Sequence, residues 1–370
     1  MSSHPDTVVA SAPGRVNLIG EHTDYNGGLA LPMAIAQRVT VTLRPRRDRI
    51  VGVTSAAPGM SPAEFPVDSE PGQVDGWAVH VAGVFWALRT AGRVVPGADV
   101  EIKSDVPVGA GLSSSHALEC ALLVALDRQA DLGLDRTDIA RLAQRAENGY
   151  VGAPTGLMDQ MAAMYGQEGC AILFDADQVS ADPIPCDLPA AGLALLVVDT
   201  KAPHRHADGE YGARRHSCEA AARTLGVSSL RAVQADPVEG VLTQLEDEIT
   251  QRRVRHVLTE NNRVLDTVRL LRAGRIRDIG ALLTASHVSL RDDYEVTVAQ
   301  LDVAVDAALA AGALGARMTG GGFGGSIIAL VDAERTAPVT DRIRAEFAAR
   351  GFTAPQAFTA VPSAGAGVDQ

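Results

Sequence analysis

A short segment near the N-terminus carries an unusual density of side chains that can donate or accept hydrogen bonds. The segment is APGRVNLIGEHTDYNGG, residues 12–28, and its polar members include Arg15, Asn17, Glu21, His22, Asp24, Tyr25 and Asn26. A turn needs only one or two such groups, and Asp and His in a turn also bind local backbone. The remaining groups suit a small polyol, because each buried hydroxyl of a ligand needs a partner. For Asn17 and Asn26 we expect a role in the turn.

A second segment, VPVGAGLSSSHALE at residues 106–119, has the composition of a phosphate-binding loop. Its glycine turn runs through three serines directly into a predicted helix. The first turn of a helix has free N–H groups and partial positive charge, and glycines allow that backbone to close on an anion. No Lys follows the glycines as it would in a P-loop, so Mg²⁺ is the simplest source of further positive charge. An ordinary serine cap is the alternative.

Two further segments carry weaker signals. RMTGGGFGGSIIAL, residues 317–330, fits G-x-G-x-x-G from Gly320 to Gly325. A strand follows these glycines where a dinucleotide fold requires a helix, so an oxidoreductase is rejected. Two interpretations of these glycines remain: a tight hairpin, or a close approach of the backbone to a bound ligand.

A further segment, GAPTGLMDQMAAMYG at residues 152–166, has one charged residue, Asp159. This residue is either a helix-capping charge or a catalytic group.

Composition excludes several classes of partner. The 370 residues have a net charge of −12, which argues against a nucleic-acid partner or an acidic membrane. The four cysteines show no paired spacing, so neither a disulfide framework nor a zinc site is expected. The first ten residues lack the features of a secretory signal, and no apolar stretch is long enough to span a bilayer. We therefore expect a cytoplasmic protein.

Mixed strand and helix patterns precede a helix-rich second half. Residues 38–46 and 98–106 alternate apolar and polar side chains as half-buried strands do, and residues 113–134 read as a helix. A soft boundary between residues 180 and 200 suggests two domains, 1–190 and 191–370. The last ten residues are expected to be frayed.

Together these motifs resemble the GHMP small-molecule kinases, and among them the galactokinase family. GRVNLIGEHTDYNGG is similar to that family's signature, VGAGLSSS to its phosphate loop, GLMDQ to its catalytic-aspartate segment and MTGGGFGG to its third motif. The segment DTKAPHRHADGEYGARRHSCEAA, residues 199–221, is also similar. The motifs extend from residue 12 to about 330, and the first is the most specific.

The resemblance implies transfer of the ATP γ-phosphate to the C1 hydroxyl of galactose, the first committed step of galactose catabolism. It implies Asp159 as the base and Arg15 beside it. Because a neighbouring Arg lowers the pKa of a carboxylate, we expect Asp159 mainly to orient the hydroxyl and to take its proton late. Arg15 would stabilise charge on the transferring group.

The resemblance also implies the binding residues. Asp24 and Tyr211 would hold the 3- and 4-hydroxyls, Glu21 and His22 would face the 6-hydroxyl, and Gly156 would line the sugar site. The phosphates would bind to Gly109, Ala110, Gly111, Leu112, Ser113, Ser114 and Ser115. Mg²⁺ would be held by Ser115 and Glu147, and Trp77 is a candidate for stacking near adenine.

The fold that the resemblance implies has two domains, an N-terminal α/β domain and a C-terminal ferredoxin-like α+β domain, with the active site in the cleft between them. One departure lies in the phosphate loop, where His116 replaces the family's usual Ala. Kinases for N-acetylgalactosamine, galacturonate or arabinose are the nearest alternatives. A non-catalytic sensor that binds galactose and ATP is an alternative of another class, and the intact phosphate loop, Asp159 and Arg15 argue against it.

Overall fold

The computed structural model describes residues 7–57, 59–202 and 207–369. The first six residues, which contributed to the expectation that there is no secretory signal, lie outside the described part of the chain. Residues 203–206 of the segment after the expected domain boundary lie outside it as well. Among the described helices, none is long and apolar enough to cross a membrane.

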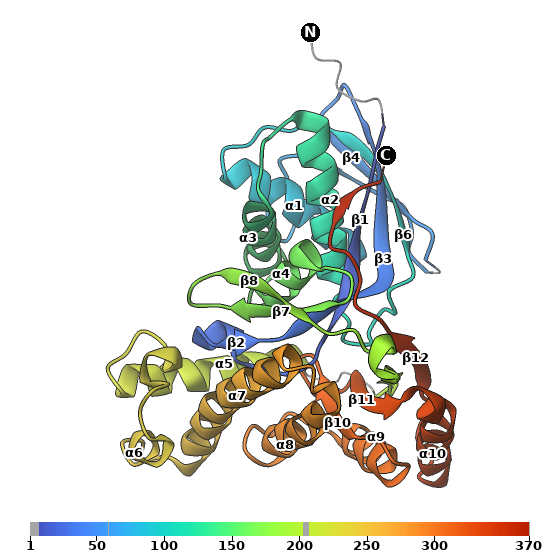
Figure 1. The fold of residues 1–370 in the computed structure, drawn as a ribbon. Coiled ribbons are helices and arrows are strands. Elements are labelled where there is room, and N and C mark those ends of the chain that lie inside the picture. Colours follow the sequence, from blue (N-terminus) through green and yellow to red (C-terminus); the bar gives the residue numbers. More distant parts are fainter. Residues whose placement is uncertain (1–6, 58, 203–206, 370) are drawn as a thin grey trace.

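A six-stranded sheet forms the upper part of the molecule in Figure 1, with strand order β13-β1-β3-β6-β4-β5. All neighbouring pairs are antiparallel except β4 with β6. The strands are β1 (Val8–Asn17), β3 (Pro32–Pro45), β4 (Ile50–Ser55), β5 (Ala63–Pro66), β6 (Ala98–Ser104) and β13 (Gly367–Val368). The alternation predicted for residues 38–46 and 98–106 therefore corresponds to two adjacent strands, β3 and β6.

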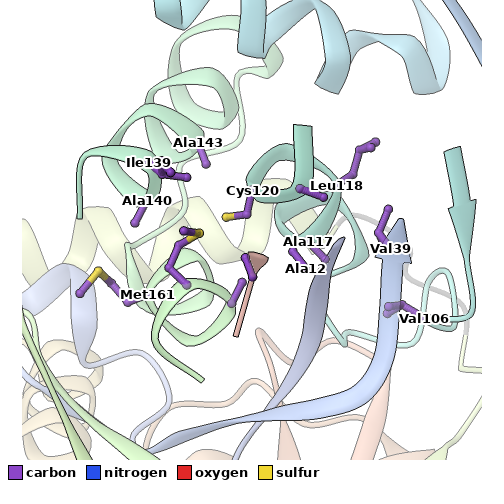
Figure 2. Packing of buried hydrophobic residues seen from close by; sticks show 14 of the residues in the cluster. Ala12, Val39, Val106, Ala117, Leu118, Cys120, Ile139, Ala140, Ala143 and Met161 are labelled. Carbon is purple, nitrogen blue, oxygen red and sulfur yellow. The ribbon is translucent and has the colours of Figure 1, made fainter. Parts of the chain in front are cut away.

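Four helices accompany this sheet: α1 (Val79–Thr90), α2 (Ser114–Ala130), α3 (Arg136–Ala146) and α4 (Met158–Tyr165). The α2 helix lies directly on β1 and β3, and the other three helices pack around it. Figure 2 shows Ala117 and Cys120 of α2 close to Ala12 of β1, with small side chains of α3 beyond them. Because these contact residues are small, α2 can approach the sheet and α3 closely.

A second sheet contains four antiparallel strands in the order β10-β11-β9-β12. Its strands are β9 (Leu193–Asp199), β10 (Gly315–Thr319), β11 (Ser326–Asp332) and β12 (Gln356–Ala360). Helices separate β9 from β10 and β11 from β12, and this order is that of a ferredoxin-like unit. The helices are α5 (Ala207–Thr224), α6 (Val238–Leu242), α7 (Glu248–Arg272), α8 (Ile279–Asp292), α9 (Ala299–Ala310) and α10 (Thr336–Ala349). The mixed two-part architecture agrees with the expected fold class.

A small third sheet, β2 (Leu29–Ala30), β7 (Cys170–Asp175) and β8 (Ser180–Pro185), lies between the first sheet and α7 in Figure 1. Its strand β2 begins directly after the polar turn that ends at Gly28, so the sheet fixes one end of that turn. The β7 and β8 strands pair antiparallel. All four cysteines are free.

The expectation of a frayed C-terminal tail is wrong. After β12 the chain returns to the first sheet, where β13 pairs with β1 (Figure 1). The Asp369 N–H donates to the Val9 carbonyl at 2.8 Å, and Ser11 Oγ donates to the Asp369 carboxylate at 3.0 Å. These contacts fix a tail whose composition alone suggested flexibility.

Candidate active site

Seven residues expected at the sugar site and the reacting centre line one cavity of about 230 Å³. They are Arg15, Glu21, His22, Asp24, Gly156, Asp159 and Tyr211. These residues come from the first strand, the following turn, the segment before α4, the first turn of α4 and helix α5, and the glycines of the third motif complete the wall. The fold thus brings together side chains that are up to 196 positions apart (211 − 15).

Asp159 is held by two groups from other parts of the chain. Arg15 makes a bidentate pair with it, Nε to Oδ1 at 2.7 Å and Nη2 to Oδ2 at 2.6 Å. Ser113 Oγ donates to Oδ2 at 2.5 Å. Burial alone would raise the pKa of Asp159, but Arg15, His116 and the Ser113 hydroxyl together hold it below its ordinary value. The carboxylate is therefore ionised at neutral pH.

The position of Arg15 follows from an irregularity in β1. The pairing of β1 with β3 shifts register between Pro13 and Arg15. Such a bulge redirects the following side chain. The backbone N–H of Arg15 also donates to the Leu112 carbonyl, so the bulge fixes this strand against the phosphate loop.

Asp24 also lines the cavity, in the 3-10 turn Asp24–Asn26. Its carboxylate accepts hydrogen bonds from the N–H groups of Tyr25, at 2.9 Å, and Met158, at 3.3 Å. It also presses against Gly156, where a Cβ atom would lie only 1.7 Å from Asp24 Oδ2. Burial, and then the charge of Asp159, raise the pKa of Asp24. Only glycine at position 156 leaves room for this carboxylate.

Glu21 is buried and tied to the third motif. Its Oε1 accepts from the Gly320 N–H at 2.7 Å and lies 3.4 Å from Nη1 of Arg317. Burial raises the pKa of Glu21, while Arg317 and Arg15 oppose that rise. Arg317 is fully buried on β10 and also donates to the Asn17 and Leu18 carbonyls. The polar turn is therefore anchored to the second sheet.

Helix α7 supports the same turn from below. Oε1 of Glu260, on α7, accepts from the Gly20 N–H at 3.0 Å and from Ser286 Oγ at 2.6 Å. The adjacent Asn261 Oδ1 accepts from the Leu29 N–H at 2.8 Å. No local feature of the sequence indicates these supports, because Glu260 and Asn261 lie more than 230 positions from the turn.

His22 has protein partners at both ring nitrogens. Nε2 lies 3.1 Å from the Gly321 carbonyl, so it carries the proton, and Nδ1 accepts from the Tyr25 hydroxyl at 2.8 Å. Burial lowers the pKa of His22 to about 3, so the ring is neutral. Asn26 donates to the His22 carbonyl and has the expected turn role. Asn17 instead lies at the end of β1, so a turn role for it is wrong.

The phosphate-loop candidate, residues 109–115, borders the same centre. Gly109 and Gly111 have φ near +73° and +72°, and Ser113 has φ near +61°. Arg15 Nη1 donates to the Gly111 carbonyl, and Ser326 Oγ donates to the Ala110 carbonyl, each at 2.7 Å. Leu112 is buried, and Ser114 begins α2. The loop is thus held between β1 and the third motif.

The third glycine motif forms the connection between β10 and β11. A Cβ atom at Gly320 would lie 3.0 Å from the Gly111 carbonyl, and one at Gly322 would lie 2.4 Å from the Val296 carbonyl. These glycines therefore permit close contact between loops as well as forming part of the cavity wall. A strand follows them, as expected, which is the wrong context for a dinucleotide fold.

The two residues expected at Mg²⁺ lie near the start of α2 and after α3. Glu147 opens the π-helical turn Glu147–Val151, and burial of its side chain is offset by hydrogen bonds and charges that hold its pKa below the ordinary value. Ser115 Oγ lies 3.4 Å from Nδ1 of His116. His116 Nδ1 lies 3.4 Å from Asp159 Oδ2, and its Nε2 lies 3.9 Å from Glu147 Oε1. His116 therefore lies between Glu147, an expected Mg²⁺ ligand, and Asp159, the expected base.

A second, largely apolar cavity of about 200 Å³ adjoins the phosphate loop. Trp77 lines it together with Val108, Ser114 and Ser115. The Trp77 indole N–H donates to the Ser61 carbonyl at 3.1 Å. This placement puts the Trp77 ring beside the loop of residues 109–115.

Sequence reasoning missed His80 and Glu119. His80 Nδ1 lies 3.0 Å from Glu147 Oε2 and 3.2 Å from Glu119 Oε1. One signal for Glu119 was available, because it is a charged residue in the otherwise apolar run of α2. His80, three residues after Trp77, had no distinguishing context.

Comparisons with known proteins define the class. The GHMP kinases N terminal domain matches residues 79–167, and the GHMP kinases C terminal domain matches residues 267–349. A mevalonate kinase structure, 16% identical, superposes with a TM-score of 0.69 over 96% of this chain and 99% of its own, and it supports the fold alone. The fold is that of a GHMP kinase.

More specific matches follow. The galactokinase galactose-binding signature matches residues 2–45. Curated galactokinases from Mycobacterium bovis and Streptomyces coelicolor are each 51% identical, over 94% and 97% of this chain and 96% and 93% of their own. A Lactococcus lactis galactokinase solved with galactose is 32% identical, with a TM-score of 0.92 over 99% of this chain and 96% of its own. The chain belongs to the galactokinase family of GHMP kinases.

Proposed function

We propose that this enzyme transfers the γ-phosphoryl group of ATP to the C1 hydroxyl of galactose, giving galactose 1-phosphate and ADP. One observation carries the proposal for the reacting centre. The Asp159 carboxylate lines the polar cavity and also accepts a hydrogen bond from Ser113 of the phosphate loop. A sugar in the cavity and a phosphate on the loop would therefore meet at Asp159.

Asp159 would orient the C1 hydroxyl and accept its proton late in the reaction. The bidentate pair with Arg15 supports this role, because it lowers the pKa of Asp159. The ionised carboxylate is then a weak base, but it can still accept a hydrogen bond from the C1 hydroxyl. Phosphoryl transfer depends more on positioning and charge stabilisation than on early deprotonation. Arg15, which also contacts the loop through Gly111, would stabilise charge on the transferring group.

The sugar would lie between Asp24 and Tyr211 on one side and Glu21 and His22 on the other. We propose that Asp24 and Tyr211 bind the 3- and 4-hydroxyls and that Glu21 and His22 face the 6-hydroxyl. Support comes from their common cavity, whose volume of about 230 Å³ suits one monosaccharide. Because His22 already has two protein partners, a contact with the sugar requires it to exchange one of them.

ATP phosphates would bind to residues 109–115, with the base near Trp77. We propose that Ser115 and Glu147 hold Mg²⁺, since a hydroxyl and an ionised carboxylate are hard oxygen donors of the kind it prefers. Bound there, the ion would neutralise charge on the phosphates. We further propose the division into domains 1–190 and 191–370, and a cytoplasmic location.

A coupled ADP-release assay with ATP, Mg²⁺ and a panel of sugars tests this function. The panel should contain galactose, glucose, N-acetylgalactosamine, galacturonate and arabinose. We expect the highest kcat/KM with galactose. A higher value for another sugar would reassign the substrate, and binding of galactose and ATP without turnover of any sugar would indicate a sensor.

A further inference from the structure

Three ionisable side chains converge where α1, α2 and the turn after α3 meet. The helices α1, α2 and α3 pack against one another and lie side by side in Figure 1. The three side chains are His80 from α1, Glu119 from α2 and Glu147 from the turn after α3. Their ligand-type atoms, His80 Nδ1 and one oxygen of each carboxylate, all lie within 4.8 Å of one another. The function proposed above uses Glu147 but gives no role to His80 or Glu119.

The cluster has binding capacity that the described part of the protein does not satisfy. Glu119 is 0% exposed, and its Oε2 has no hydrogen-bond partner among the described residues. His116 Nε2, beside the cluster, is also buried and without such a partner. Two adjacent buried carboxylates repel each other, and charge in such a site needs compensation.

We propose that His80, Glu119 and Glu147 form a binding site for a first-row divalent cation such as Zn²⁺ or Co²⁺, separate from the Mg²⁺ that would accompany ATP. The spacing is close to what a tetrahedral site requires, because two ligand atoms of such a site, each about 2.1 Å from the metal, lie about 3.4 Å apart. His80 Nδ1 lies 3.0 and 3.2 Å from its two carboxylate neighbours. An imidazole nitrogen favours Zn²⁺ and Co²⁺ over Mg²⁺.

Charge and access also agree with the proposal. One divalent cation neutralises two carboxylates, and a neutral cluster avoids the cost of a buried net charge. His80 lines the cavity that adjoins Ser114 and Ser115, and its side chain is 24% exposed. A cation and its remaining water ligands therefore have a path to the cluster from the nucleotide side.

Glu147 connects the proposed cation site to the phosphate loop, because its two carboxylate oxygens face different groups. Oε2 faces His80, whereas Oε1 lies 3.9 Å from His116, which in turn approaches Asp159. A cation bound at Oε2 would fix the orientation in which Oε1 faces the phosphate-loop side. His80 and Glu119 would then be positioning residues, and the cation would bind without nucleotide.

Calorimetric titration of Zn²⁺ into the full-length, chelator-treated and nucleotide-free protein tests the proposal. We expect one saturable site that binds Zn²⁺ more tightly than Mg²⁺, and an increase in melting temperature on binding. His80→Asn and Glu119→Gln should each weaken Zn²⁺ binding by about tenfold or more. His216→Asn, at an exposed histidine of α5, is the matched control and should bind as the wild type does.

Unchanged Zn²⁺ affinity in His80→Asn, or no saturable binding to the wild type, would overturn the proposal and leave His80 as an imidazolium paired with two carboxylates. The Co²⁺ absorption spectrum of the wild type keeps the test valid if a variant does not fold. At one equivalent of Co²⁺ we expect ligand-field absorption bands, and addition of Zn²⁺ should abolish them. Absence of such bands would contradict the site.

Discussion

Arg15 and Asp159 form a bidentate ion pair, with Nε–Oδ1 and Nη2–Oδ2 distances of 2.7 and 2.6 Å, at the point where the polar cavity meets the glycine loop. The guanidinium also donates to the Gly111 carbonyl of that loop. One arginine thus fixes the proposed acceptor of the sugar proton relative to the proposed phosphate site. The geometry favours a reaction controlled by positioning, and it makes both residues testable.

Asp159→Asn should retain galactose binding and lose most of kcat. The amide can still accept and donate hydrogen bonds, but it cannot take the proton from the C1 hydroxyl. Loss of a general base lowers rates by about 10²–10⁴-fold. Steady-state kinetics together with galactose titration measure both quantities. Turnover near that of the wild type would remove Asp159 from the role of base.

Arg15→Lys should lower kcat/KM although the charge is kept. An ammonium group cannot reproduce the planar pair with Asp159 while also reaching the Gly111 carbonyl. We expect a decrease of at least about tenfold, since each lost charge-assisted hydrogen bond is worth about 1.5–3 kcal/mol. Arg38→Lys, at an arginine outside the cavity lining, is the control for general effects of this exchange. Equal kcat/KM in Arg15→Lys and the wild type would make Arg15 a structural charge.

Gly156→Ala should damage sugar binding selectively. A Cβ atom there would lie 1.7 Å from Asp24 Oδ2, so the carboxylate must move from the cavity wall. We expect KM for galactose to rise by about tenfold or more, because a bound hydroxyl would lose a charged partner. KM for ATP should change little. Gly209→Ala, at an open position near the start of α5, is a control for glycine replacement. An unchanged KM for galactose would show that Asp24 does not depend on this contact.

Stability should fall as the pH is lowered from about 6.5 towards 4, in part because of His256. This residue is fully buried on α7, and its Nε2 lies 3.1 Å from the Glu21 carbonyl. Burial lowers the pKa of His256 to about 4 from an ordinary 6.5. Between these values the unfolded chain binds a proton that the folded chain does not, so acid favours unfolding by up to about 1.4 kcal/mol per pH unit.

Urea unfolding between pH 7 and 5 measures this dependence. His256→Gln keeps an N–H donor but removes the titrating group, so its stability should change less with pH over that range. If the variant and the wild type have the same slope, His256 does not contribute to acid sensitivity. His22, whose pKa burial lowers to about 3, should add to the slope in both proteins.

Much of the fold could be predicted because its signals are local. The alternation of residues 38–46, the serines that begin α2 and the strand after Gly325 each predicted an element that the structure contains. The residue types of the polar turn suit a small polyol, and the family resemblance implied that this ligand is a sugar. That the members of the turn share a cavity with Asp159 and Tyr211 was implied only by the family resemblance.

The supports of the site could not be predicted, because they depend on packing between distant segments. Arg317 immediately precedes the third motif, yet only the sheet order places it beside Glu21. His80 and Glu119 lie close together because α1 and α2 pack against each other. The C-terminal tail has a flexible composition, and its pairing with β1 depends on contacts across more than 350 positions.

The comparison of galactose with glucose tests the central claim most directly. The two sugars differ in whether the 4-hydroxyl is axial or equatorial, so the proposed partners Asp24 and Tyr211 would pair with one and not with the other. Each unpaired buried group costs about 1–3 kcal/mol, and sites built around a hydroxyl can discriminate by about 10⁴–10⁵-fold. We predict that wild-type kcat/KM strongly favours galactose, that Tyr211→Phe narrows the difference mainly by weakening galactose, and that 2-deoxygalactose remains a substrate. Comparable kcat/KM for glucose and galactose in the wild type would contradict the account, even if every residue proposed for phosphate handling proved correct.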